Sequence, residues 1–357
     1  MHQNNFDFLR FLFAFVVVLG HIVALSAVDS LEFLRPYFDT HLCVTGFFVV
    51  SGFLITQSYI RSRDLKKYLI KRANRLLPAY IFVVCITALG LSVISTVPVK
   101  EYFTGVGLYK YLVCNLLFMN FLQPCLPGVF LHNILCAVNG ALWTIKLEVS
   151  FYLLLPVIIY IVDRVKKKYL VFLGIYLLSL FYRDAFEFLY HATGKNLYSI
   201  LSHQLPGYMT YFIAGVALHY WFNAFLRYKK HMIAVALIVF LIEYYFKIEY
   251  LLPIAWSVIV MYFAYSFTGL NGFGRYGDVS YGIYIFHYPI IQIFVAFGAF
   301  HRYNPYKISF IIILIVLLVA ILSWHLLEKR FLKRTTAKIG LDGLIQPKQA
   351  VNGRPTR

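Results

Sequence analysis

Long apolar runs separated by short polar segments fill almost the whole chain. Runs of about 20 apolar residues can cross a bilayer as helices. Ten are counted when 141–162 is taken as a span and 109–123 as a half-inserted or external helix. The other nine runs are 8–28, 40–60, 76–97, 168–182, 205–222, 231–246, 250–267, 279–298 and 307–327. The pattern predicts an all-α integral membrane protein with about ten transmembrane helices.

The basic residues are distributed unevenly between the two sides of this helix array. With the N-terminus placed inside, 24 of the 33 Lys and Arg residues fall in cytoplasmic segments, most densely in 61–75. Basic residues accumulate on the cytoplasmic side of membrane proteins, so both termini are expected in the cytoplasm. Orientation and anionic lipid headgroups then account for the net charge of +18, and no nucleic-acid partner is expected.

Composition favours a single membrane domain. Hydrophobic residues make up 61% of the chain and charged residues 13%. We expect a multi-pass membrane domain over 1–334 and a disordered cytoplasmic tail over 335–357. The first apolar run has no small-residue cleavage site and contains two ionisable residues, so it is interpreted as a resident helix and not as a signal peptide.

The five cysteines show no metal-ligand spacing such as CxxC, and no metal is expected. At most one disulfide fits within 114–136, and buried free thiols are the favoured interpretation.

Arg10 and His21 lie in the first apolar run, eleven positions apart. Eleven helical residues make about three turns, so the two side chains share one face, about 16 Å apart along the axis. Ionisable groups at membrane depth usually face a bundle interior or a wet cavity, which makes both residues functional candidates. The alternative is structural: a histidine that caps a neighbouring helix and an arginine that extends to the cytoplasmic surface.

Two elements beside the second span suggest a ligand path. In FFVVSGFLIT, Ser51 and Gly52 interrupt an apolar helix; small residues there allow close helix packing or let a ligand pass near the backbone.

In the basic segment that follows, Lys71, Arg72 and Arg75 stand at helical spacing just before Pro78, which is expected to define how the chain enters the bilayer. Arginine forks suit phosphate oxygens, so a phosphorylated cofactor could bind at the cytoplasmic mouth. For the remaining basic residues of this segment, anchoring on anionic lipid is the favoured interpretation; these are Arg61, Arg63, Lys66 and Lys67.

Glu148 is placed in the outer half of a span, on one face with Tyr152. Lys146 is two residues away and points to a different face, so the two charges cannot simply neutralise each other. A buried carboxylate requires a proton or a partner. His21, on the same outer side, is the expected partner of Glu148, either for catalysis or as a structural hydrogen bond.

In GDVSYGIYIFHYPI, Ser280, Tyr284 and His287 form a polar stripe on the ninth span. Pro289 is expected to kink this helix near His287 and so to open room for a ligand. A packed core histidine is the structural alternative.

Together these segments resemble the membrane-bound acyltransferase-3 family, bacterial multi-pass enzymes that O-acylate cell-surface sugars. The resemblance covers about residues 5–330. It begins with the spacing of Arg10 and His21 and continues in order with FFVVSGFLIT, KRANRLLPAY, LWTIKLEVSFYLLLP and VSYGIYIFHYPI. These are similar to the family's FFxxSGFLI, KRxxRLxPxY, W(S/T)LxxExxFYLxxP and SYxxYLxHxPI elements.

The resemblance implies an O-acyltransferase, most simply an O-acetyltransferase, in the bacterial cytoplasmic (inner) membrane. It would move the acyl group of cytoplasmic acyl-CoA, such as acetyl-CoA, to a sugar hydroxyl of an extracytoplasmic or lipid-linked surface polysaccharide. The residues expected to bind the nucleotide phosphates and the pantetheine arm are Arg10, Ser51, Gly52, Lys71, Arg72 and Arg75.

His21 would act as general base on the acceptor hydroxyl or carry the acyl group transiently. Glu148 would orient the imidazole, as a carboxylate does in hydrolase triads. Supporting roles toward substrate or structure are expected for Trp143, Tyr152, Ser280, Tyr284 and His287.

The chain departs from the family pattern after Glu328, where Lys329 and Arg330 stand in place of a frequent proline. We also expect no appended hydrolase-like domain of the kind that some members carry, so any further transfer module would be a separate protein.

Two other classes would share many of these features. A polysaccharide or lipid-linked sugar transporter (flippase) would also show about ten spans with charges at depth, although no inverted repeat is found. A polymerase or glycosyltransferase acting on lipid-linked sugars would use the basic segment for pyrophosphate. Stabilisation by coenzyme A thioesters distinguishes the acyltransferase from both. The acceptor sugar, the length of the acyl group and the oligomeric state are not indicated by the sequence.

Overall fold

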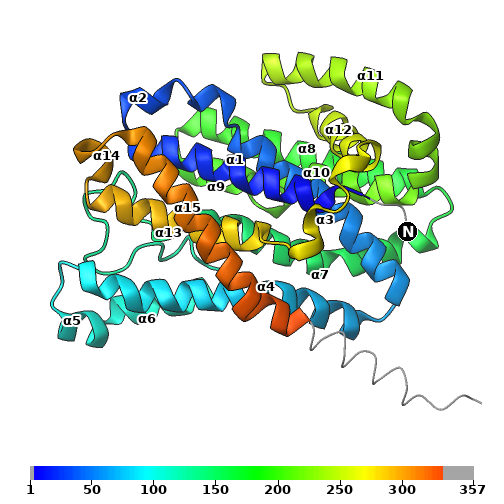
Figure 1. Ribbon diagram of the computed structural model, residues 1–357. Helices are drawn as coiled ribbons and strands as arrows, with labels where there is room; N and C mark the ends of the chain where they lie inside the picture. The colour runs from blue at the N-terminus through cyan, green and yellow to red at the C-terminus, as the bar shows by residue number, and fades with distance from the viewer. Residues whose placement is uncertain (1–3, 333–357) are drawn as a thin grey trace, which may run out of the picture.

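The computed structural model describes residues 4–332, and within this range it consists of helices and connecting segments without a strand (Figure 1). The long helices are α1 Phe6–Ser26, α3 Thr40–Ser62, α4 Leu65–Gly90, α7 Trp143–Arg164, α8 Lys168–Thr193, α10 Leu205–Tyr220, α11 Phe222–Phe246, α12 Leu252–Ser266, α13 Ser280–Ala296 and α15 Pro305–Ser323. Short helices connect them: α2 Asp29–Glu32, α5 Val99–Thr104, α6 Val106–Leu116, α9 Asn196–Ser202 and α14 Ala299–Arg302. The predicted all-helical class is confirmed for this range. The expected disordered tail lies outside the described residues.

Six helical stretches are long and apolar enough to cross a membrane, namely 6–26, 29–62, 65–94, 140–164, 168–193 and 305–332. α12 and the segment that ends at Arg275 would make a seventh, bent by 75°. The chain is therefore a multi-pass membrane protein, whereas ten spans and the orientation of the termini stay predictions. Of the two runs between which the sequence had to choose, 141–162 lies in α7, and 109–123 holds only the 11-residue α6 and irregular chain.

The basic segment is helical from Leu65 onward, so the helix begins eleven residues before the apolar run 76–97. Asp64 caps α4 by accepting a hydrogen bond from the Lys67 amide at 2.9 Å. Such a cap compensates an unpaired amide of the first turn and favours helix from that point. Pro78 consequently lies inside α4 and not where the helix begins.

Gly52 is a helix-packing residue. A Cβ atom at Gly52 would lie 2.2 Å from the Phe212 carbonyl oxygen of α10, and one at Gly215 would lie 2.2 Å from the Val49 oxygen of α3. The two glycines therefore let α3 and α10 touch through their backbones, as small residues commonly do between membrane helices. Close helix packing, the structural alternative, therefore describes Gly52, and its expected contact with the pantetheine arm stays a prediction.

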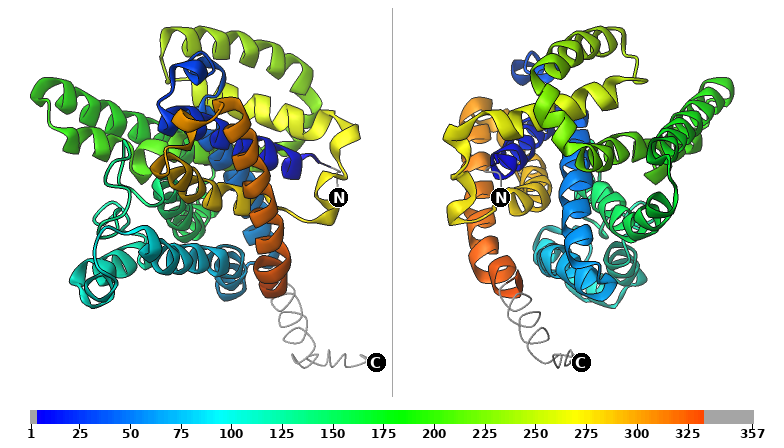
Figure 2. Two further views of the ribbon diagram at one scale, coloured as in Figure 1. Left: turned by 60° about the vertical axis from the view of Figure 1, so that its left-hand side comes forward. Right: turned by 90° about the vertical axis from the view of Figure 1, so that its right-hand side faces the viewer.

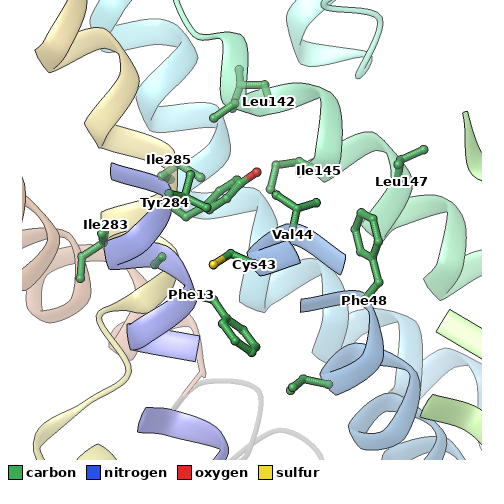
Figure 3. Packing of buried hydrophobic residues seen from close by; sticks show 14 of the residues in the cluster. Phe13, Cys43, Val44, Phe48, Leu142, Ile145, Leu147, Ile283, Tyr284 and Ile285 are labelled. Atoms are coloured by element: carbon green, nitrogen blue, oxygen red, sulfur yellow. The ribbon is translucent and has the colours of Figure 1, made fainter. Parts of the chain in front are cut away.

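The centre of the bundle lies where α1, α3, α7 and α13 meet. Figure 3 shows Phe13, Val44, Ile145 and Tyr284 from these four helices gathered around one buried apolar region. α1 and α13 pack side by side. This packing brings segments of the chain that are more than 250 residues apart into contact, as in the bond between His21 and His287.

The bundle has two distinct ends in Figure 1. The N-terminus, the α3–α4 connection and the end of α15 lie at one end, and α2, α14 and the chain between α6 and α7 lie at the other. Figure 2 shows α8 and α9 projecting from the side of the bundle. The chain between α6 and α7 contains a disulfide between Cys125 and Cys136. This is the disulfide that the cysteine spacing allowed, so the favoured interpretation of free thiols is wrong for this pair.

Candidate active site

A partly buried cluster of opposite charges joins three helices at the end of the bundle that carries the N-terminus. Asp278, just before α13, lies 3.0 Å from Arg10 of α1 and 2.5 Å from Arg75 of α4. Ser280 donates its hydroxyl hydrogen to the same carboxylate. Glu328, fully buried after α15, has its Oε2 atom 3.9 Å from Nη1 of Arg75. The cluster neutralises two arginines and ties α1, α4 and α13 together.

Asp278 is held ionised by this arrangement. Burial by itself raises the pKa of Asp278, but Arg10, Arg75 and the hydrogen bonds from Ser280 outweigh it and hold the pKa well below the usual range. Sequence reasoning missed Asp278. The available signal was an acidic residue immediately before a span, in the same segment as Ser280.

Arg72 has no carboxylate partner among the described residues. It donates a hydrogen bond to the Ser58 hydroxyl at 3.3 Å, and its guanidinium lies 5.8 Å from the Tyr152 ring centre. Its Nε atom is buried without a hydrogen-bond partner in the part of the chain that the structure describes. An uncommitted buried donor on an arginine is suited to an anionic oxygen of a ligand.

A cavity of about 550 Å³, the basic cavity, opens beside these arginines. Its basic lining is Arg10, Arg61, Lys67, Lys71, Arg72 and Arg75. Lys71 is therefore placed as the sequence predicted. Arg61 and Lys67, for which lipid anchoring was favoured, line the cavity as well. By contrast, Arg63 pairs with Asp163 at 2.5 Å on the surface.

A narrower cavity of about 110 Å³, the inner cavity, continues inward and shares Arg10, Arg72 and Arg75 with the basic cavity. Its polar lining further in is Ser51, Thr144, Glu148, Tyr152, Ser280 and Tyr284. The Tyr152 hydroxyl donates to the Glu148 carboxylate, and the hydroxyls of Thr144 and Tyr284 lie 2.7 Å apart. The structure therefore brings most of the sequence-predicted site residues around two neighbouring cavities that share three arginines.

His21 and His287 form a hydrogen-bonded pair next to the inner cavity. His21 Nδ1 lies 2.8 Å from His287 Nε2, and His287 Nδ1 lies 3.2 Å from the Ile283 carbonyl oxygen. The Tyr284 ring, which lines the inner cavity, is 5.9 Å from the His287 ring. Tyr284 therefore connects the inner cavity with the histidine pair.

This geometry assigns the tautomers when both rings are neutral. The Ile283 carbonyl can only accept, so His287 Nδ1 carries a hydrogen and its Nε2 accepts from His21 Nδ1. The remaining nitrogen of His21, Nε2, then holds a lone pair and can accept a proton. His287 is fully buried, whereas His21 is partly exposed. The pair is thus arranged to present His21 as a base.

The expected pairing of His21 with Glu148 is wrong. His21 bonds to His287 and Glu148 to Tyr152, and no described hydrogen bond or ion pair joins the first two. Glu148 lines the inner cavity together with Arg10, Arg72 and Arg75, because its helix, α7, packs against α3 and α4. The neighbour of His21 comes instead from α13, which packs against α1. Trp143 neither lines the inner cavity nor contacts the histidine pair; its ring centre is 5.6 Å from that of Tyr208.

These features define a membrane protein with an arginine-lined cavity that leads toward a paired histidine. The family model for the acyltransferase domain matches residues 3–326, and the chain belongs to this acyltransferase family. The chain is 27% identical to an O-acetyl transferase of Shigella phage Sf6 over 96% of its own length and 100% of the phage protein. It is 24% identical to nodulation protein 10 of Rhizobium leguminosarum bv. viciae over 95% of each chain. No solved structure matches.

The family and the phage relative support an enzyme that uses an acyl donor. Among residues 4–332, no group of three or more His, Cys, Asp or Glu side chains is arranged to hold a metal ion.

Proposed function

We propose that this protein is an O-acetyltransferase that moves the acetyl group of cytoplasmic acetyl-CoA to a sugar hydroxyl of an extracytoplasmic or lipid-linked surface polysaccharide. The observation that carries the proposal is the pair of neighbouring cavities that share three arginines, with Tyr284 in the lining of the inner cavity and next to His287. Membership of the acyltransferase family and the name of the phage relative support the reaction class.

The proposal places both termini in the cytoplasm and ten spans in the inner membrane of a bacterium. The basic cavity is at the end of the bundle that carries the N-terminus, and the Cys125–Cys136 disulfide is in the chain at the opposite end. Disulfides form and persist in oxidising compartments outside the cytoplasm, and basic residues accumulate inside. Both signals support the same orientation.

Reporter fusions test this orientation. Alkaline phosphatase fused after Arg63 or Lys166 should be inactive, because both sites lie at the proposed cytoplasmic end. Fusions after Leu131 or Lys195 should be active. Phosphatase activity after Arg63 would contradict the orientation and with it the cytoplasmic donor.

In the proposed complex, Arg72 and Lys71 bind phosphate oxygens of the nucleotide at the mouth. The pantetheine arm follows the inner cavity past Ser51 and Tyr152, so that the thioester lies near Thr144 and Tyr284. Arg10 and Arg75 have a different role from the one first expected, because carboxylates already neutralise their charges: Asp7 and Asp278 beside Arg10, and Asp278 and Glu328 beside Arg75. Their proposed contribution is to hold the mouth in shape.

In the proposed transfer step, the acceptor hydroxyl oxygen attacks the thioester carbonyl carbon while His21 Nε2 takes the hydroxyl proton. The carbon–sulfur bond breaks, and the sulfur receives that proton, which leaves the O-acetylated sugar and free coenzyme A. His287 is a positioning residue, since its Nε2 holds His21 in the tautomer that exposes Nε2. Glu148 keeps Tyr152 in the wall of the inner cavity. Transient acetylation of His21 remains the alternative route.

Arg72→Ala should weaken coenzyme A binding about ten- to a hundred-fold, because a hydrogen bond to a charged group contributes about 1.5–3 kcal/mol. Lys66→Ala is the matched control: Lys66 is exposed on the same helix and is not among the residues lining the basic cavity. Calorimetric titration of the purified protein with coenzyme A measures both. Equal, small effects of the two substitutions on coenzyme A binding would indicate that the basic segment anchors the protein on anionic lipid and does not bind the nucleotide.

The class itself is tested on the cell surface. Surface polysaccharide from cells with and without this protein should differ in base-labile acetyl groups. Membranes that contain the protein should transfer radiolabel from [acetyl-¹⁴C]acetyl-CoA to that polysaccharide. A protein that changes the amount of exported polysaccharide but not its acetyl content would instead be a transporter or polymerase.

A further inference from the structure

A third cavity, the polar cavity, lies outside the site described above. It has a volume of about 290 Å³, close to the lower limit of about 300 Å³ for small-molecule sites. The first turn of α3, the ends of α8 and α9, the start of α10 and the α11–α12 connection surround it. Chain direction puts these segments at the end of the bundle opposite the basic cavity. Its principal lining residues are His41, Arg183, Glu187, Tyr208, Tyr211 and Glu249.

Two cationic side chains, Arg183 and Lys247, and three carboxylates, Asp184, Glu187 and Glu249, line the polar cavity, so its charges largely compensate one another. Arg183 Nη1 lies 3.1 Å from Glu249, and its Nη2 lies 3.0 Å from Asp184. His41 Nδ1 is 3.9 Å from the same glutamate. A phosphate or another anion would have to compete with two carboxylates for this arginine. The cavity therefore suits an uncharged ligand with many hydrogen-bonding groups.

Tyr211 supplies an observation that points to such a ligand. Its side chain is 1% exposed, and its hydroxyl has no hydrogen-bond partner among the described residues. Buried hydroxyls in folded proteins nearly always have a partner, from the protein or from ordered water. Tyr211 lines the polar cavity and its hydroxyl is closed off from solvent, so a small movement of the side chain would let a hydroxyl of a molecule in that cavity complete the missing bond.

The polar cavity is separated from the inner cavity by aromatic side chains. The Tyr208 ring, which lines the polar cavity, lies 5.4 Å from that of Phe48, which lines the inner cavity. Tyr208 also contacts His41 and His203 through ring faces and edges at 5.9 Å. A polar lining with an aromatic wall offers hydroxyl partners and an apolar ring face at once, which matches the two kinds of surface on a sugar ring.

We infer that the polar cavity binds a neutral sugar unit of the acceptor glycan, with the Tyr211 hydroxyl as a hydrogen-bonding group and Tyr208 as the wall toward the donor side. The inference rests on the proposed acetyl transfer and identifies its acceptor subsite. The other side of the wall is the space proposed for the thioester.

Kinetics with two substrates tests the subsite. The acceptor probe is a set of oligosaccharides cut from the surface polysaccharide of cells that lack this protein, and the donor is radiolabelled acetyl-CoA. For Tyr211→Phe, the KM for the oligosaccharides should rise about 2- to 13-fold, as expected for one lost neutral hydrogen bond. The KM for acetyl-CoA should not change.

Thermal unfolding of the purified protein separates this role from a structural one. Without oligosaccharide, Tyr211→Phe should unfold at the wild-type temperature, because its hydroxyl bonds to nothing in the described protein. The stabilisation that the oligosaccharides give to the wild type should be reduced. Tyr109→Phe is the control: it removes an exposed hydroxyl, bonded to the Phe103 carbonyl, from α6, and it should change neither KM.

Glu187→Gln provides a second probe in case Tyr211→Phe folds poorly. Glu187 lines the same cavity, and the substitution should raise the acceptor KM selectively. If the wild type transfers acetyl groups but both variants keep the wild-type acceptor KM, the subsite is wrong and the proposed function stands. If the wild type transfers no acetyl group to any glycan, the proposed function itself is wrong. Selective loss of acetyl-CoA binding in Tyr211→Phe would also overturn the subsite.

Discussion

His21→Ala is expected to reduce acetyl transfer by about a hundred- to ten-thousand-fold, because this is the usual effect of losing a positioned general base. Binding of coenzyme A should persist, since His21 is not among the residues that line the basic cavity and Arg10, which does line it, lies about 16 Å along α1 from His21. Single-turnover transfer of radiolabel and calorimetric binding measure the two effects separately. A well-expressed His21→Ala protein that acetylates normally would remove His21 from the mechanism.

Variants of His287 provide the matched control for that experiment. In His287→Gln, the side-chain oxygen can still accept the hydrogen bond from His21 Nδ1, whereas His287→Leu fills the space without an acceptor. We therefore expect the glutamine variant to retain more activity than the leucine variant. Equal activities would show that the tautomer of His21 does not depend on His287. Combining His287→Leu with His21→Ala should add little to His21→Ala alone, because residues that act as a unit are non-additive.

Asp278→Asn is expected to lower the stability of the folded protein by about 3–5 kcal/mol, the usual effect of removing one partner from a buried ion pair. The substitution leaves Arg10 and Arg75 without their shared carboxylate at a site where Asp278 is 12% exposed. A lower midpoint of thermal unfolding in detergent and a lower yield from membranes are the expected results.

Asp163→Asn is the control for Asp278→Asn. Asp163 pairs with Arg63 at a more exposed position, with side chains 30% and 54% exposed, and such surface pairs contribute about 0–1 kcal/mol. Similar losses in both variants would contradict the role given to the buried cluster.

The pH dependence follows from the lowered pKa of Asp278. The contribution of Asp278 to the free energy of unfolding is present at every pH above the ordinary aspartate pKa of about 4, and it is lost as the pH falls toward the lowered pKa. A neutral asparagine should therefore remove acid sensitivity that the wild type retains.

The positions of the helices were largely predictable from the sequence. Each apolar run chosen as a span falls on a helix, because a chain in lipid must satisfy its own backbone hydrogen bonds and a helix does so locally. The start of α4 was missed, since the basic residues before Leu76 look like a loop by hydropathy alone. The helix begins at Leu65 because Asp64 caps it, and this capping residue is a local signal that the sequence contains.

The residues of the candidate site were easier to predict than their partners. Arg10, Ser51 and Tyr152 were selected as charged, small or aromatic residues in apolar runs, and Arg72 was selected from the basic segment; all four line the inner cavity. Gly52 was selected by the same reasoning and packs against α10 instead. Hydropathy and spacing cannot separate the two outcomes, because a small residue next to a ligand and one next to a helix have the same sequence signature.

The sequence by itself determined that this is a helical membrane protein, where its basic residues gather, and which family it resembles. These properties depend on composition and on order along the chain, and each helix forms from local hydrogen bonds. Only the tertiary structure decided that His21 pairs with His287 rather than Glu148, and that Asp278 neutralises Arg10 and Arg75. Such contacts join residues up to 268 positions apart. They depend on which helix faces are pressed together, and this is set by the packing of the whole bundle.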